Sequence, residues 1–235
     1  MARVSTTSLV VFALLTLTMV GIKLLFDHYP GEFPLRDQAA AFTWEIIGGI
    51  TLLAFAGVFA SRASGLPEPF QHAAKEREGL WVAIAVGILY GAITVWMDFS
   101  ERRANPNAEW VHMDLPWSIP FYTFGAIFLE FLLRLGALCI VFWFVHVVLL
   151  QRRLRLTVFW IVNAIVALYE IWPHIADDVG AGRWEPAVGR LIGPLYLSNV
   201  FEGWLLLRYS WLAPVVFRLA FYLIWHVLYP GIVPR

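Results

Sequence analysis

The sequence predicts an all-α fold, a polytopic transmembrane helical bundle of about seven to eight spans. Of its 235 residues, 60% are hydrophobic and only 14% are charged, whereas soluble domains carry about 45–50% apolar and about 25% charged residues. Several apolar runs approach the roughly 20 residues that cross a hydrocarbon core of about 30 Å. A transmembrane β-barrel would instead show alternating segments of about ten residues, and such segments do not dominate this chain.

Seven apolar runs mark the expected helices, and segments rich in Pro, Gly, Asn and charged residues separate them. The runs are Leu9–Phe26, Ala41–Ser61, Gly79–Phe99, Ile119–Leu150, Leu156–Ala176, Leu195–Tyr209 and Trp211–Tyr229. The fourth run is too long for one upright helix and too short for two full spans, so it is either one tilted helix or two pieces broken near Gly136. The sixth run is at the lower limit of a span. The first exceeds the 7–15 apolar residues of a signal peptide, so we expect a retained helix.

Charge and cysteine content narrow the function classes. The net charge is zero, which gives no basis for binding nucleic acid. The single cysteine, Cys139, lies in an apolar run and has no second cysteine with which to form a disulfide. The basic turn QRRLR (151–155) is the clearest cytoplasmic marker under the positive-inside rule, and it predicts a cytoplasmic N-terminus.

Ionisable residues inside the spans are the candidate functional residues, because each costs roughly 2.5–3.5 kcal/mol at the centre of a membrane helix. They are Glu45, Glu130, Arg134, His146, Glu170, His174, Glu202, Arg218 and His226. Glu130 and Arg134 are four residues apart on one helix, with the acid first. This spacing favours an ion pair that joins helices. The alternative is a carboxylate that an arginine orients beside a polar cavity.

Glu170 and His174 repeat the four-residue spacing on the next helix. Both side chains can therefore reach one site, either as two ligands of a divalent metal or as an acid–base pair. Pro173 is expected to loosen the helix there, which membrane proteins tolerate where a cavity is lined. The alternative is a histidine at the membrane interface near Asp177 and Asp178.

Arg218 lies within the last span, and an unpaired buried guanidinium would be very costly. We therefore expect it to pair with Glu130, Glu170 or Glu202. Glu45 and His226 lie near span ends, where reaching toward the interface explains them. His146 lies close to the basic turn, and the same simple interpretation applies.

Three segments in the C-terminal half resemble the CPBP family of intramembrane proteases, which includes CAAX prenyl endopeptidases. FGAIFLEFLLRLG (124–136) is similar to the first motif, a Gly-rich helix entry leading to Glu-Glu-x-x-x-Arg. FWIVNAIVALYEIWPH (159–174) is similar to the second, which ends in Phe-x-x-x-His. The segment 199–228 resembles the closing pair of helices. The resemblance covers about half of the chain, and the first three helices match only in hydrophobicity.

The resemblance implies catalytic roles for Glu130 and His174, which would activate water to cut a peptide bond inside the membrane. Arg134 matches the arginine of the first motif and would support the site. Leu129 occupies the place of the first glutamate, and Glu170 that of the phenylalanine of the second motif.

Two departures lie in the third motif. Arg218 stands at its histidine, and Tyr222 where Asn or Asp is expected. Arginine neither binds a metal nor deprotonates in a protein. Glu170 could replace the lost base, with Arg218 and Tyr222 as supports.

The resemblance divides one integrated membrane domain into N-terminal helices (1–115, about three spans) and a CPBP-like core (116–235). It implies a divergent protease that hydrolyses membrane or prenylated substrates in the inner membrane of a bacterium, with a divalent metal as one alternative. The alternative hypothesis is an inactive pseudoprotease that acts as a membrane scaffold or as a subunit of a complex. In that protein the acids and arginines would form a closed network. A transporter or haem protein ranks lower, because neither internal repeats nor facing histidines stand out.

Overall fold

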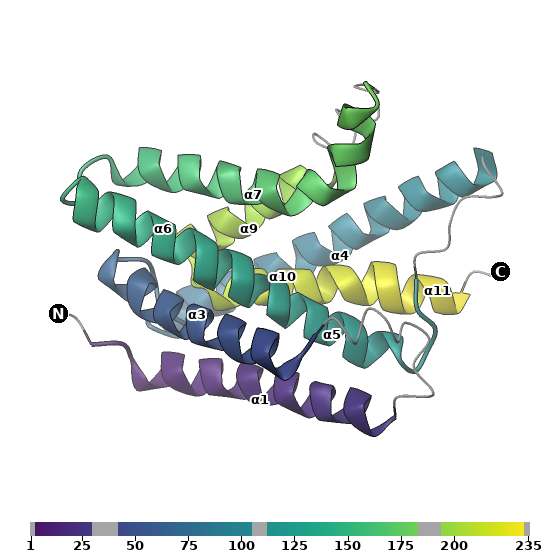
Figure 1. Cartoon of the computed structure of the whole chain (residues 1–235), viewed down its shortest axis with the longest axis horizontal. Helices are drawn as coiled ribbons and strands as arrows, with labels where there is room; N and C mark the ends of the chain where they lie inside the picture. The colour runs from purple at the N-terminus through teal and green to yellow at the C-terminus, as the bar shows by residue number, and fades with distance from the viewer. Residues whose placement is uncertain (1–2, 30–41, 105–111, 183–193, 233–235) are drawn as a thin grey trace.

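The computed structural model describes residues 3–29, 42–104, 112–182 and 194–232, and this part of the chain forms helices and no strand (Figure 1). The all-α prediction is therefore confirmed. The α-helices are α1 (Thr6–His28), α3 (Trp44–Ala63), α4 (Ala73–Ala104), α5 (Ser118–Leu129), α6 (Ile140–Trp143), α7 (Arg155–Gly180), α9 (Pro194–Arg208), α10 (Leu212–Tyr222) and α11 (Tyr229–Ile232). Three π-helical segments continue them, namely η1 (Glu130–Cys139), η2 (Phe144–Leu149) and η3 (Leu223–Leu228).

Six helices within the described residues are long and apolar enough to cross a membrane. They are Thr6–His28, Trp44–Ala63, Ala73–Arg103, Ser118–Leu149, Arg155–Pro173 and Leu212–Ile232. The expected count of seven to eight spans is thus not confirmed. The predicted sixth span does form a helix, α9, but its 15 residues extend only about 22 Å, less than the thickness of the hydrocarbon core.

The long fourth run is one continuous helix. It comprises α5, η1, α6 and η2 without interruption at Gly136, and its 32 residues extend about 48 Å. Two of its four segments are π-helical, a form that is rare and often occurs at functional sites. The helix therefore spans with length to spare, and Figure 1 shows it crossing the bundle obliquely.

Two helices extend beyond their predicted limits. α4 begins at Ala73, so the last residues of the expected connection are helical, which suits their Ala, Lys, Glu and Arg content. α7 continues through Pro173 to Gly180, and its ribbon changes direction toward that end (Figure 1). A bend near an internal proline is the usual consequence of the lost backbone hydrogen bond.

Glycines allow the central helices to approach one another closely. A Cβ atom at Gly57 of α3 would lie 2.0 Å from the backbone oxygen of Leu135 in η1. A Cβ atom at Gly87 of α4 would lie 2.6 Å from the backbone oxygen of Phe217 in α10. Small residues at such positions are the usual means of close helix packing in membranes. These contacts hold η1 and α10, which carry the site described below, against α3 and α4.

We predict that Gly57→Ala destabilises the protein by about 1–3 kcal/mol, because the new methyl group meets backbone that cannot move aside. The matched control is Gly49→Ala on the same helix, where nothing lies within 4 Å of the added Cβ atom. Thermal unfolding in detergent should show a lower midpoint for Gly57→Ala only. Equal midpoints for the two variants would contradict the close packing of α3 on η1.

Candidate functional site

A cluster of buried charged side chains lies where four helices meet. Its members, which we call the charge network, are Glu130 and Arg134 of η1, Glu170 of α7, Asn199 and Glu202 of α9, and Arg218 of α10. All are buried except Glu170, whose side chain is 12% exposed. The network thus brings together segments that are up to 88 residues apart in sequence.

Arg218 is the centre of the network because it binds all three acids. Its Nε donates to Glu130 Oε1 at 2.6 Å, and its Nη1 donates to Glu170 Oε1 at 2.6 Å. Its Nη2 donates to Glu202 Oε2 at 2.6 Å and to Asn199 Oδ1 at 3.1 Å. The planar guanidinium has donors on several edges, which is why arginine rather than lysine suits such an arrangement.

Arg134 shares three of the partners of Arg218, namely Glu202, Asn199 and Glu170. Its Nη2 donates to Glu202 Oε2, to Asn199 Oδ1 at 2.6 Å and to the Asn199 backbone oxygen at 3.1 Å. Its distance to Glu170 Oε2 is 3.4 Å. Glu202 Oε2 and Asn199 Oδ1 therefore each accept from both arginines. This sharing ties α9 to both the long fourth helix and the last helix.

The contact between Glu130 and Arg134 is looser than the sequence spacing predicts. Arg134 Nε lies 4.0 Å from Glu130 Oε2, which is too far for a hydrogen bond. Glu130 Oε2 and the Nε and Nη1 atoms of Arg134 are buried without a hydrogen-bond partner. Glu130 and Arg134 are therefore close enough to attract each other electrostatically. The hydrogen-bond partner of Glu130, however, is Arg218 and not Arg134.

The structure brings together five of the six residues predicted for the site, namely Glu130, Arg134, Glu170, Arg218 and Tyr222. His174 lies in the backbone of α7, but its side chain is outside the described residues. Tyr222 follows Arg218 by one turn and interacts with its guanidinium. Its ring lies 5.8 Å from that of Tyr122.

Sequence analysis missed Asn199, which carries no charge and so gave no signal within an apolar run. It also explained His226 wrongly. Instead of reaching toward the interface, His226 is only 9% exposed, and its Nδ1 lies 3.2 Å from Nδ1 of His112. His146 is likewise buried, with 2% of its surface exposed, and its Nδ1 lies 3.2 Å from the backbone oxygen of Arg153 in the basic turn.

Among the described residues, no group of three or more His, Cys, Asp or Glu could hold a metal ion. In the charge network the guanidinium groups occupy the positions around the carboxylates that a metal would need. The alternative of a divalent metal at Glu170 and His174 lies partly outside the described residues, because it depends on the histidine side chain.

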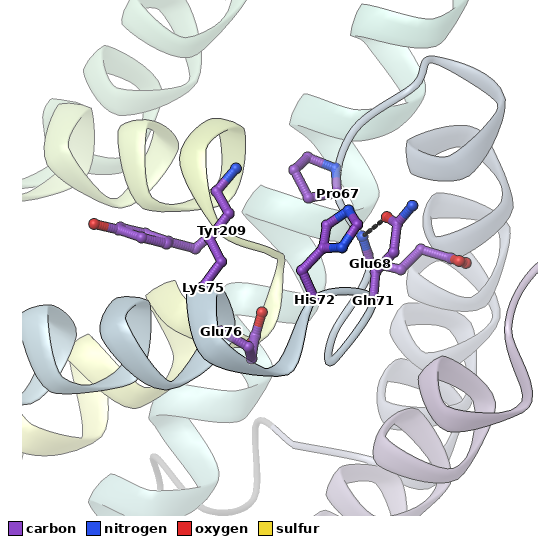
Figure 2. A pocket seen from close by; sticks show the side chains of 7 residues that line it. All are labelled: Pro67, Glu68, Gln71, His72, Lys75, Glu76 and Tyr209. Carbon is purple, nitrogen blue, oxygen red and sulfur yellow. Dashed lines mark hydrogen bonds between the residues drawn. The ribbon is translucent and has the colours of Figure 1, made fainter.

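A separate small hollow lies between the α3–α4 connection and the end of α9 (Figure 2). Its lining residues are Pro67, Glu68, Gln71, His72, Lys75, Glu76 and Tyr209. The acids here already have partners. Glu68 accepts from the backbone nitrogen of Ser5 at 3.1 Å, and Glu76 accepts from the Ser210 hydroxyl at 2.6 Å. The hollow therefore does not replace the charge network as the candidate site.

No protein-family model matches the chain, and neither a curated protein nor a solved structure matches it. The chemistry of the charge network therefore follows from its own geometry. Each of the three carboxyl groups accepts a hydrogen bond from the guanidinium of Arg218 at 2.6 Å, so the acids and the arginine already bind one another. The arrangement is suited to joining helices rather than to activating water.

We predict that Arg218→Gln destabilises the protein by about 3–5 kcal/mol, because three buried carboxylates lose their shared partner. The control is Arg208→Gln, at an exposed arginine outside the network, which should stay within about 0.5 kcal/mol of the original chain. Unfolding in detergent measures both. Similar losses in the two variants would mean that the network contributes nothing special to stability.

Proposed function

We propose that this chain is a non-hydrolytic integral membrane protein, a pseudoprotease with a CPBP-like core that acts as a scaffold or as a subunit of a membrane complex. The observation that carries the proposal is that Arg218 donates to Glu130, Glu170 and Glu202, each at 2.6 Å. Each of these carboxyl groups is already bound to a guanidinium, which leaves less of it to bind and orient a water molecule. The proposal includes the inner membrane of a bacterium and a cytoplasmic N-terminus, which the basic QRRLR turn favours.

The energetics of buried ion pairs explain why such a protein would keep several charged groups inside its helical bundle. Replacing a buried ion pair by apolar residues often leaves stability unchanged, but removing one partner is strongly destabilising. Hydrogen-bonded polar groups also join membrane helices, where the hydrophobic effect does not. A network that links four helices through hydrogen bonds would hold them in one arrangement, which is what a scaffold requires.

A second candidate function is peptide-bond hydrolysis inside the membrane, at a site rebuilt around Glu170. One observation favours it, namely that Glu170 is the least buried acid of the network, with a side chain 12% exposed. It also precedes His174 by one helical turn on α7, next to the internal Pro173. In this alternative Glu170 would be the base, with Glu130 and His174 beside it, and Arg218 would stabilise the oxyanion.

The two candidates are separated by reconstituting the protein in liposomes with fluorogenic transmembrane and prenylated reporter peptides. We expect the protein to give the same turnover as protein-free vesicles. Glu130→Gln, Glu170→Gln and His174→Ala should then leave the signal unchanged. Turnover that the original chain supports and that any of these three variants abolishes would overturn the non-hydrolytic proposal. Arg208→Gln is the control, since the exposed Arg208 lies outside the network.

A further inference from the structure

One end of the bundle carries an excess of positive charge. We call it the basic end, and it consists of the described segments 3–5, 61–78, 150–156 and 208–211. These segments contain eight lysine and arginine residues and three glutamates, which gives a net charge of plus five. The whole chain has a net charge of zero, so acids are in excess elsewhere. Figure 1 shows the N-terminus and the turn between η2 and α7 at this end.

The three acids of the basic end have partners of their own. Glu68 accepts from a backbone nitrogen of the N-terminal segment, and Glu76 accepts from a hydroxyl group of the segment that follows α9. Glu78 accepts from the hydroxyl of Tyr209 at 3.0 Å. None of these acids forms an ion pair with the basic turn, residues 151–155. The positive charge of that turn is therefore not neutralised by them.

Two arginines of the basic turn are fixed against the end of α3. Arg152 Nη2 donates to the backbone oxygen of Ala63 at 3.0 Å, and Arg155 Nη2 donates to that of Gly65 at 2.9 Å. The last carbonyl groups of a helix lack partners within the helix and attract cations. Both arginines are exposed, and a guanidinium has five donors, so these bonds leave other donors of each on the surface.

The third arginine has no such structural explanation. Arg153 is exposed, and within the described part of the chain only its backbone forms a hydrogen bond, to the oxygen of Leu150 at 2.9 Å. The dipole of α7 does not account for the cluster, because cations are unfavourable at the start of a helix. Three positive charges within four residues repel one another, and an anion bound between them would remove that repulsion.

The position of the basic turn indicates the kind of anion. Residues 150–154 separate two candidate spans, Ser118–Leu149 and Arg155–Pro173, so the arginines lie at the level of the lipid head groups. Beside them Leu149, Leu154 and Leu156 are 58%, 64% and 59% exposed. Clusters of arginine and lysine next to a membrane span attract anionic lipids. Exposed leucines at the same place suit the acyl chains that lie below the head groups.

We propose that the basic turn binds an anionic phospholipid, whose phosphate group contacts Arg152, Arg153 and Arg155 and whose acyl chains cover the three exposed leucines. Guanidinium groups bind phosphate oxygens through paired donors. Phosphate from solution would match the arginines but would leave the leucines uncovered, so the lipid is the better match. The bound lipid would join the turn between η2 and α7 to the end of α3. This inference does not depend on the scaffold role, because an enzyme with the same turn would bind the same lipid.

The positive-inside rule gives a simpler account of the basic turn, in which its arginines only set the orientation of the chain. That rule explains how many arginines the turn contains. It does not explain why two of them are fixed by hydrogen bonds to α3, or why leucines are exposed beside them. The two accounts differ in whether the folded protein prefers an anionic lipid.

Lipid preference is tested by native mass spectrometry of the full chain, released from detergent micelles that contain equal amounts of dioleoyl phosphatidylglycerol and dioleoyl phosphatidylcholine. The acyl chains are identical, so a difference reports the head group alone. We expect the complex with one phosphatidylglycerol to exceed that with phosphatidylcholine more than about ten-fold, since each arginine near an anionic group contributes about five-fold. Equal amounts of the two complexes would overturn the proposal and leave the arginines as an orientation signal only.

The place of binding is tested by Arg153→Gln, which should weaken phosphatidylglycerol binding about five-fold. Its unfolding midpoint should not change, because the Arg153 side chain is exposed and its charge supports no contact of the described fold. The control is Arg103→Gln, which removes the same charge from an exposed arginine at the opposite end of α4. That variant should bind the lipid like the original chain. Equal weakening in the two variants would show that the lipid is not bound at the basic turn.

The source of the phosphate group is tested by Leu154→Asn and by competition with inorganic phosphate. Asparagine tolerates the φ of 55° at this position but removes the apolar contact, so phosphatidylglycerol binding should weaken several-fold. An excess of inorganic phosphate should not displace the lipid. Displacement by phosphate, together with unchanged lipid binding in Leu154→Asn, would identify phosphate from solution as the ligand and overturn the lipid proposal.

Discussion

The contact of one guanidinium with three carboxylates is the interaction on which the core of this bundle depends. Arg218 reaches Glu130, Glu170 and Glu202 at 2.6 Å each, and these acids come from three other helices. In lipid, apolar surfaces gain little by meeting one another, because the acyl chains are equally apolar. Hydrogen bonds and close packing must therefore hold the helices together. Arg218 supplies hydrogen bonds between helices, and glycines such as Gly57 and Gly87 permit close packing.

Irregular helix geometry places the acids around Arg218. Glu130 begins the π-helical segment η1, and Arg134 lies within it. A π-helical turn shifts the side chains that follow relative to an α-helix, which is consistent with the 4.0 Å separation between Glu130 and Arg134 despite their i, i+4 spacing. α9 has only 15 residues within the described part of the chain, yet it brings Asn199 and Glu202 within hydrogen-bond distance of Arg218.

The helical class could be predicted from composition, and the pairing of Arg218 with acids could be predicted from the cost of burying a guanidinium alone. Other features could not. Asn199 gives no periodic or charge signal, and nothing in the local sequence shows that it accepts from both arginines. The buried contact of His112 with His226 joins residues 114 apart, which only the tertiary arrangement brings together. The seventh span is not confirmed, because α9 has only 15 residues within the described part of the chain and apolar length alone does not distinguish it from a full span.

The residue type at position 218 also determines what the network can do. A histidine at this position could take and return a proton but would offer at most two donors. Arginine offers five donors and a permanent charge, so it engages all three acids at once and cannot serve as a base. Among the described residues, Arg134 provides the second guanidinium of the network, through its contact with Glu202 Oε2. The feature that argues against hydrolysis and the feature that joins four helices therefore have a single origin, the guanidinium of Arg218.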